Sequence, residues 1–340
     1  MRYIGSKKQL LGFIEDSIKE ECGDISDMVF CDLFSGTVSV GSHFKDKCAK
    51  VYANDWEYYS YVLQRNYLQN VPKDIDESII ENYNGISKVG LVTKNLSPYG
   101  KEGRMFFTEE NAKLIDGCRQ KIESDFQSGV INESEYYFLL CSLIESFDKV
   151  ANTTGVYGAF LKKFKGTASK KFELKAYKPL KGKSGVAHQG DSNEYIKEIE
   201  GDILYLDPPY NNRQYGANYH IINYIAEYKD VKFTERTVDG EKKESKTALY
   251  DYNKSEYSIK KKALKALEDL LNNSNFKYIF LSYNDEGIIS MDDMKAAMSK
   301  FGTYSLKKKE YRRYKSNNHE QTQDSVYELL HILVKEDKQC

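Results

Sequence analysis

The segment ILYLDPPY, residues 203–210, decides the fold class of this chain. Its first four residues form an apolar run that is typical of a buried strand. The polar part of the segment therefore begins at Asp207, where that strand ends. Open α/β sheets place their ligands at the carboxyl ends of their strands. The segment thus predicts a binding site at the edge of such a sheet.

The tetrapeptide Asp207-Pro208-Pro209-Tyr210 combines two hydrogen-bond acceptors with an aromatic ring. Because consecutive prolines restrict φ and lack N–H donors, the carbonyl of Pro208 belongs to a stiff loop. Together with the Asp207 carboxylate, it can accept both hydrogens of an amino group on a planar substrate that stacks on Tyr210. The alternative is a strand followed by a proline-stiffened turn without chemistry. We interpret the full tetrapeptide as the catalytic segment of an amino-group methyltransferase.

The two ends of the chain carry the alternation of strands and helices that is typical of a doubly wound α/β sheet. The predicted strands are residues 28–34, 50–53, 203–206 and 278–281, with a closing antiparallel pair at residues 304–311 and 326–334. The predicted helices of this part are residues 38–47, 56–68, 259–271 and 291–301. The middle contains two segments of helical periodicity, residues 108–126 and 133–151. We therefore predict an α/β fold with a doubly wound mixed sheet and a mainly helical insertion.

A glycine turn follows the first predicted strand, within residues 32–37. Such a turn lets the backbone approach a ligand closely, and a following helix offers N–H groups at its start. The second strand ends at Asn54-Asp55, where an acid can accept hydrogen bonds from ribose hydroxyls or cap the helix that starts at Trp56. Val38 stands at the second glycine position of the G-x-G-x-x-G fingerprint, which argues against a dinucleotide. A nucleoside without phosphates, such as S-adenosylmethionine, fits better.

The amino-terminal segment Tyr3-Ile4-Gly5-Ser6-Lys7 precedes the first predicted helix. Lys7 can pair with the methionine carboxylate of such a cofactor, and Tyr3 can line its methionine pocket. The alternative is a frayed terminus that ends in a helix cap.

The order of these motifs resembles that of the Dam-like, α-class DNA adenine-N6 methyltransferases. Residues 3–10, 32–41 and 281–284 are similar to further motifs of that family, and Val38 and the long segment after Tyr210 depart from it. The resemblance implies a Rossmann-like fold, S-adenosyl-L-methionine as cofactor, and methylation of N6 of an adenine flipped out of double-stranded DNA. The positions that it assigns to the cofactor are Tyr3, Gly5, Lys7, Asp32, Phe34, Ser35, Gly36, Asn54, Asp55, Gly190 and Asp191.

The same resemblance suggests how the chain is divided by function. Residues 1–70 and 186–340 would form the S-adenosylmethionine-binding catalytic domain. Residues 71–185 would form an inserted target-recognition domain, whose base specificity the resemblance does not supply. Residues 211–257 are a candidate for a further DNA-binding segment.

Three clusters of polar residues are candidates for DNA contact. Residues 162–183 contain nine lysines and one acid, although a solvated charged face is the usual meaning of such a run. Residues 211–215 directly follow the catalytic tetrapeptide and contain an arginine and a glutamine, which can recognise base edges. Residues 307–315 contain six basic residues and one acid, in a predicted hairpin that reaches DNA or forms an ordinary charged tip. The predicted DNA-binding residues are Lys162, Lys163, Arg213, Gln214, Arg312 and Arg313.

Composition limits the other classes of function. The formal charge of −1 does not by itself indicate a nucleic-acid partner. The six cysteines lack metal-ligand spacing, and no apolar run is long enough to cross a membrane. We therefore predict a cytoplasmic monomer that uses no metal. A restriction endonuclease is a candidate partner, because the enzyme would either serve a restriction–modification system or act as an orphan.

Two alternatives remain open at this point. The same pocket can accept another amino substrate, namely an RNA adenine, a cytosine N4 or a protein glutamine amide. A catalytically silent DNA-binding module would keep the fold without the reaction.

Overall fold

The computed structural model describes residues 3–312 and 325–336. The chain forms two compact units, each assembled from three separate segments. The helical unit consists of Met1–Ile4, Glu57–Pro179 and Tyr215–Asn253. The sheet unit consists of Gly5–Trp56, Leu180–Gln214 and Lys254–Cys340. No described helix is long and apolar enough to cross a membrane.

A seven-stranded mixed sheet organises the sheet unit, in the order β3-β2-β1-β4-β7-β9-β8. The first five strands of this order are parallel, and β9 is antiparallel to both of its neighbours. The strands are β1 (Val29–Asp32), β2 (Lys50–Asp55), β3 (Val186–Gln189), β4 (Glu200–Leu206), β7 (Asn275–Asn284), β8 (Gly302–Arg312) and β9 (Ser325–Lys335). The chain order reverses between β1 and β4, which is where doubly wound sheets bind their ligands. The predicted doubly wound mixed sheet is confirmed.

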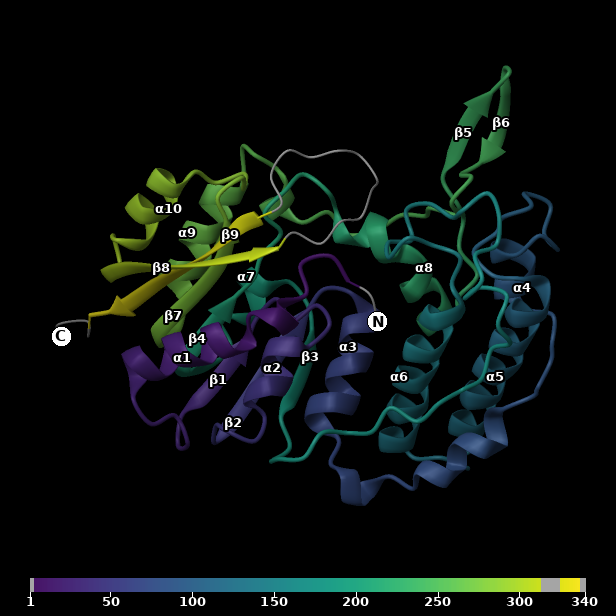
Figure 1. The fold of residues 1–340 in the computed structure, drawn as a ribbon, viewed down its shortest axis with the longest axis horizontal. Helices are drawn as coiled ribbons and strands as arrows, with labels where there is room; N and C mark the ends of the chain where they lie inside the picture. The colour runs from purple at the N-terminus through teal and green to yellow at the C-terminus, as the bar shows by residue number, and fades with distance from the viewer. Residues whose placement is uncertain (1–2, 313–324, 337–340) are drawn as a thin grey trace. The chain divides into compact units, whose positions relative to one another are not determined.

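Helices cover both faces of this sheet (Figure 1). Side chains alternate along β1, so that Phe30 stacks on Phe44 of α2 with ring centroids 4.4 Å apart, whereas Cys31 joins a buried cluster that includes Leu267 of α9. A Glu15–His43 contact of 2.6 Å links α1 to α2. The elements of the first face are η1 (Lys7–Gln9), α1 (Leu11–Cys22) and α2 (Ser39–Phe44). Those of the second are α7 (Ser192–Tyr195), η5 (Glu256–Ser258), α9 (Ala263–Asn273) and α10 (Met291–Met298).

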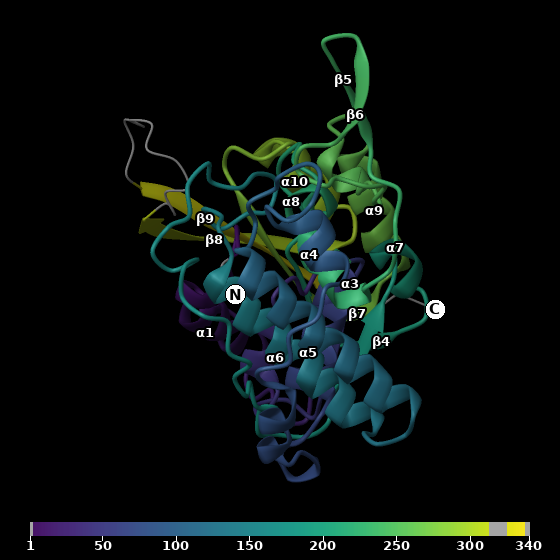
Figure 2. The same ribbon diagram turned by 90° about the vertical axis from the view of Figure 1, so that its right-hand side faces the viewer.

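The helical unit is built around two long helices that lie side by side, α5 (Glu109–Gln127) and α6 (Glu133–Val150) (Figure 2). Both begin at a side-chain cap, from Thr108 in α5 and from a capping box at Asn132 in α6. The two predicted central helices are therefore confirmed. The other elements of this unit are α3 (Tyr58–Gln64), the π-helix η2 (Arg65–Gln69), η3 (Pro72–Asp74), η4 (Glu77–Tyr83), α4 (Leu91–Leu96) and α8 (Tyr215–Glu227).

The compact units divide the chain at other positions than the predicted functional domains. α3 belongs to the helical unit because it packs against α6 and α8, although the resemblance places residues 57–70 in the catalytic domain. Residues 215–253 join the same unit and include α8, which the sequence analysis does not predict. The functional boundaries themselves stay a prediction.

A hairpin of β5 (Glu235–Val238) and β6 (Glu241–Glu244) extends from the helices of its unit (Figures 1 and 2). Both residues of its turn, Asp239 and Gly240, have positive φ, at 52° and 80°. This conformation is the one that two-residue hairpins with Asp-Gly favour. The sequence analysis predicts no strand here, because the two strands are charged and mostly exposed and so carry no apolar alternation.

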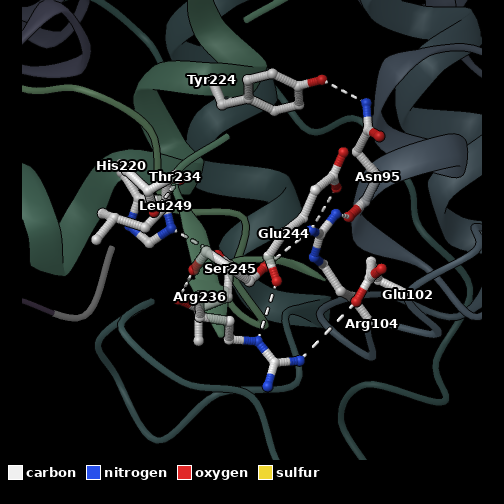
Figure 3. A network of polar contacts seen from close by, with 11 residues as sticks. Asn95, Glu102, Arg104, His220, Tyr224, Thr234, Arg236, Glu244, Ser245 and Leu249 are labelled. Atoms are coloured by element: carbon white, nitrogen blue, oxygen red, sulfur yellow. Dashed lines mark hydrogen bonds and ion pairs between the residues drawn. The ribbon is translucent and has the colours of Figure 1, made fainter. Parts of the chain in front are cut away.

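The base of this hairpin is anchored by the buried guanidinium of Arg104 (Figure 3). Arg104 donates to the Glu244 carboxylate at 3.0 Å and to the Ser245 carbonyl at 2.8 Å. It also donates to the Asn95 carbonyl at 3.0 Å. Arg236 also links the two strands of the hairpin, because its guanidinium donates to the Glu244 carbonyl at 3.0 Å. These charge-assisted bonds fix the direction in which the hairpin leaves the helical unit.

Candidate active site

The polar residues predicted for the cofactor and the catalytic tetrapeptide gather at one edge of the sheet. Parallel strands end on the same side, and β1, β2, β3 and β4 end next to these residues. Asp32 is the last residue of β1, Asn54 and Asp55 end β2, and Asp207 follows β4. The sheet unit therefore brings together residues that lie far apart in the sequence.

The glycine turn after β1 is held by an acid from β2. The N–H of Gly36 donates to Oδ2 of Asp55 at 2.7 Å, and Gly36 has a φ of 51°. Val38 has a φ of 61°, a conformation that β-branched residues rarely adopt. The residue at the second glycine position of the fingerprint thus keeps a glycine-like backbone, at a conformational cost of about 1–3 kcal/mol.

The side chains of Asp32 and Asn54 are buried and form hydrogen bonds to the backbone around this turn. The Asp32 carboxylate accepts the Gly41 N–H at 2.8 Å, and burial raises the pKa of Asp32 to about 7. Asn54 is fully buried, and its amide nitrogen donates to the Leu33 carbonyl at 3.1 Å. The Asn54 side chain also contacts Nδ1 of His188 at 2.8 Å. Both residues therefore shape the loops, and direct contact with a cofactor stays a prediction for them.

The loop after β3 is shaped around Gly190. A side chain at this position would place its Cβ 2.6 Å from the imidazole of His188, which itself stacks on Tyr195 with ring centroids 3.8 Å apart. The N–H of Gly190 donates to the Asp55 carbonyl at 3.1 Å. Asp191 then caps the short helix α7 by accepting the Asn193 N–H at 2.8 Å. A larger residue at position 190 would therefore require the His188 ring to move.

A cavity of about 610 Å³ lies beside these loops. This volume is within the range of small-molecule sites. Phe34 and Tyr257 form one part of its wall, in an edge-to-face contact with ring centroids 5.1 Å apart. The lining also includes Trp56, Asp191 and further acids, together with a cluster of lysines on α9 and the residues before it. An adenosine fits this mixture of aromatic faces and carboxylates, so the cavity suits a nucleoside cofactor.

The tetrapeptide forms the stiff loop expected from its prolines. Pro208 is buried, and the Tyr210 carbonyl accepts the Ile288 N–H at 2.9 Å. The Tyr210 ring packs edge-to-face on Tyr283, with ring centroids 6.3 Å apart. Pro209, which lies between Pro208 and Tyr210 in the sequence, is partly buried. The loop after β7 therefore holds the tetrapeptide in place.

The Asp207 carboxylate pairs with Lys7. Nζ of Lys7 lies 3.1 Å from Oδ1 of Asp207 and 3.0 Å from Oε1 of Glu328 on β9. Burial raises the pKa of Asp207 to about 6, with Lys7 opposing this shift and Glu328 adding to it. The Lys7 pKa is raised well above its ordinary value, because the two carboxylates outweigh its burial. The predicted binding of the methionine carboxylate by Lys7 stays a prediction.

Tyr3 belongs to the helical unit. Its ring stacks on Tyr219 of α8 with centroids 4.6 Å apart, and its hydroxyl accepts from Tyr59 at 3.1 Å. Gly5 begins the sheet unit with a φ of 78°. The structure thus assigns the two ends of the amino-terminal motif to different units, and the contact of Tyr3 with the methionine pocket stays a prediction.

The candidate DNA-binding residues have different environments. Lys162 and Lys163 are exposed in the helical unit, and Arg213 is exposed in the sheet unit. Gln214 instead clasps Ser255, donating to its carbonyl at 3.2 Å and accepting its N–H at 2.8 Å. A pair of bonds to a base edge would require this clasp to open.

The remaining two candidates lie at the end of β8. The backbone of Arg312 pairs with Ser325 of β9. Arg313 lies outside the described residues.

Three residues of the site are missed by the sequence analysis. Trp56 directly follows Asp55, so its place at the end of β2 is a usable signal. Tyr257 and Glu328 have none, because each reaches the site from a distant part of the chain. Among the described residues, no group of three or more His, Cys, Asp or Glu is arranged to hold a metal ion.

Comparison with known proteins agrees with this geometry. Residues 3–297 match the family model described as D12 class N6 adenine-specific DNA methyltransferase. Type II methyltransferase M.NlaIII of Neisseria lactamica is 43% identical, over 98% of this chain and 99% of that protein. Type II methyltransferase M.CviAII of Paramecium bursaria Chlorella virus 1 is 36% identical, over 92% of each chain. Modification methylase LlaI of Lactococcus lactis subsp. lactis is 37% identical over 94% of this chain and 52% of its own length.

Proposed function

The chain belongs to the D12 class of N6 adenine-specific DNA methyltransferases, and from this premise we propose which of its residues perform the reaction. S-adenosyl-L-methionine is the methyl donor of these enzymes. The substrate is a DNA adenine, and we propose that it is bound after it has been flipped out of double-stranded DNA. The observation that carries the proposal is the Asp207–Tyr210 loop at the carboxyl end of β4, in the same unit as a nucleoside-sized cavity at the ends of β1, β2 and β3.

We assign the cofactor to the cavity at the ends of β1, β2 and β3. Phe34, Trp56 and Tyr257 would hold the adenine of the cofactor between apolar faces. Asp55 would accept the ribose hydroxyls, and Asp191 would contact the adenine. Ser35, Gly36 and Gly190 would allow the close approach of the backbone. When bound, the cofactor supplies a methyl group that is already activated on a sulfonium centre.

The protein's own part in the reaction is to orient and activate the adenine amino group. The lone pair of this nitrogen is delocalised into the ring, so the amine is a poor nucleophile. Two acceptors, the Asp207 carboxylate and the Pro208 carbonyl, would hold its two hydrogens and favour a tetrahedral nitrogen with a localised lone pair. The carboxylate also stabilises the positive charge that develops on the nitrogen. Catalysis is then mainly alignment and electrostatics.

The proposed function is tested by incubating the purified protein with labelled S-adenosylmethionine and unmethylated genomic DNA. The product is then sequenced by a method that reports N6-methyladenine. Methylation in one short recurring sequence is the expected result, and it would also identify the recognition site. Label in RNA or protein would move the reaction to another amino substrate. DNA binding without any transfer would favour the silent DNA-binding module.

Replacement of Tyr210 tests the stacking of the target base. Tyr210→Ala should lower the single-turnover rate on mapped DNA by about tenfold or more, since a stacked base is worth ~1–3 kcal/mol. Tyr210→Phe is the matched control and should stay within about twofold of the unchanged enzyme, because stacking needs the ring and not the hydroxyl. Equal losses in the two variants would exclude a stacking role.

The lysine run gives a prediction for DNA affinity. In a plot of the logarithm of the DNA association constant against the logarithm of the salt concentration, the slope is negative. The double variant Lys162→Gln/Lys163→Gln should make this slope less steep by about 2, since each phosphate contact contributes ~0.9. The double variant Lys73→Gln/Lys88→Gln, at exposed lysines of the same unit, is the control and should leave the slope unchanged. Binding is measured by fluorescence anisotropy at several salt concentrations. An identical slope in both double variants would assign the lysines to a solvated face.

We also infer a cytoplasmic enzyme that acts as a monomer, which modification of one adenine per binding event would allow. A cognate restriction endonuclease is the partner that we propose. The names of the relatives, type II methyltransferase and modification methylase, support such a system.

A further inference from the structure

A second carboxylate is buried beside the proposed catalytic one. Glu328 lies on β9, and its side chain is 3% exposed. Its Oε1 accepts from the ammonium of Lys7 at 3.0 Å and from the hydroxyl of Ser282 on β7. The same ammonium lies 3.1 Å from Oδ1 of Asp207. Lys7 thus lies between two carboxylates, one from the loop after β4 and one from β9.

This arrangement has an electrostatic cost, because two carboxylates share one ammonium away from water. Burying ions costs several kcal/mol per ion before pairing recovers part of it. One ammonium is enough to neutralise Asp207, so the second carboxylate is not required for charge balance. Glu328 even opposes ionisation of Asp207, since a like charge disfavours a carboxylate. We therefore expect Glu328 to act through the position in which it holds the Lys7 ammonium.

The elements that carry the cluster are neighbours in the sheet. β4 pairs with β7, and β7 pairs with β9, with Asn284 opposite Glu328 and Ser282 opposite Leu330. Ser282 and Glu328 therefore occupy fixed positions on paired strands. Lys7, by contrast, extends from the short helix η1 near the start of the sheet unit. A flexible side chain from a single 3₁₀ turn needs anchors on the sheet to keep one conformation.

We propose that Glu328 is a positioning residue for methyl transfer, which with Ser282 holds the Lys7 ammonium against Oδ1 of Asp207. This inference rests on the proposed role of Asp207. Lys7 then fixes the direction of the carboxylate, so that Oδ2 is presented to the adenine amino group. The charged or titratable groups that face Asp207 are Lys7 from η1, Glu328 from β9, Tyr205 from β4 and Asp32 from β1.

The proposal predicts opposite pH shifts for two substitutions. Methyl transfer requires an ionised Asp207, so its rate should rise with pH through an acid limb near pH 6. Glu328→Gln removes a like charge while Lys7 keeps its pairing with Asp207, so the limb should move to lower pH by about one unit. Lys7→Met removes the opposite charge, so the limb should move to higher pH. The plateau rate of Glu328→Gln should also fall about tenfold, because Lys7 loses an anchor.

The experiment measures single-turnover methyl transfer against pH, on DNA whose methylated site has been mapped. Asp292→Asn, at an exposed acid on α10 outside the proposed sites, is the control and should leave the profile unchanged. A merely structural role of Glu328 would leave the plateau rate of the folded enzyme unchanged, because loss of the charge alone moves only the limb. Shifts of the two variants in the same direction, or a Glu328→Gln profile like that of Asp292→Asn, would overturn the proposal.

A second readout separates this inference from the proposed function. The carboxyl titration of Asp207 is followed by NMR in the full-length protein without DNA, with ¹³C-labelled aspartate and assignment from Asp207→Asn. Glu328→Gln should lower its midpoint, and Lys7→Met should raise it. An unchanged midpoint would overturn the link from Glu328 through Lys7 to Asp207. Absence of methyl transfer by the unchanged enzyme, with both shifts present, would instead remove the proposed function.

Discussion

Replacing Asp207 should lower methyl transfer by roughly a thousandfold and leave cofactor binding nearly unchanged. The loss is expected because the carboxylate stabilises charge that develops only in the transition state, and removal of such a group costs about 10²–10³ in rate. Asp207→Ala removes both oxygens. Asp207→Asn keeps the size of the side chain and removes its charge. Both variants should show this loss of rate in single-turnover assays, because neither presents a carboxylate to the amino group.

The control for this prediction is Asp292→Asn, at an exposed acid on α10 of the same unit. Its rate and its calorimetric affinity for S-adenosylmethionine should match those of the unchanged enzyme. Retention of turnover in Asp207→Ala would assign the chemistry to another group. A parallel loss of cofactor affinity would indicate that Asp207 shapes the cofactor cavity and not the reaction.

The second large effect is expected at Asp55. This carboxylate holds the Gly36 N–H at 2.7 Å and is the residue that we assign to the ribose hydroxyls. A hydrogen bond to a charged group is worth ~1.5–3 kcal/mol, so Asp55→Ala should weaken cofactor binding by about 10- to 100-fold. Calorimetric titration with S-adenosylmethionine measures this loss directly.

Two further variants locate the origin of that effect. Asp55→Asn keeps an oxygen that can accept from Gly36, so it should recover part of the affinity if the turn matters as well as the ribose. Asp46→Ala, at an exposed acid just before β2, should bind the cofactor normally. An unchanged affinity in Asp55→Ala would mean that the cofactor does not contact the end of β2.

Much of the site is predictable because its motifs are local. A buried parallel strand is an apolar run, and its ligand-binding residues follow it directly in the sequence. The positions of Asp32, Asp55 and Asp207 at the ends of such runs are enough to select them as candidates. Their assembly at one edge then follows from the parallel pairing of β1, β2 and β4. The family resemblance adds the cofactor and the substrate, and the match over residues 3–297 confirms that family.

The elements that the sequence analysis misses have weak or overlooked signals. β3 is four residues long and only partly buried, which leaves no periodicity to detect. The β5–β6 hairpin has charged strands, and its Asp239-Gly240 turn is the available signal. Helix α8 is missed although residues 215–227 are rich in apolar side chains. Its assignment to the helical unit depends on packing against α3 and α6.

The sequence by itself determined the strand–loop motifs, because each depends on residues that are neighbours along the chain. The order of these motifs indicated the reaction class and the cofactor through the family resemblance. Only the tertiary structure decided that Lys7 pairs with both Asp207 and Glu328, and that Phe34 meets Tyr257 in the cavity wall. The reason is physical. Contacts between distant segments depend on strand order and register, and no local pattern of side chains encodes which charge on β9 will face a lysine near the amino terminus.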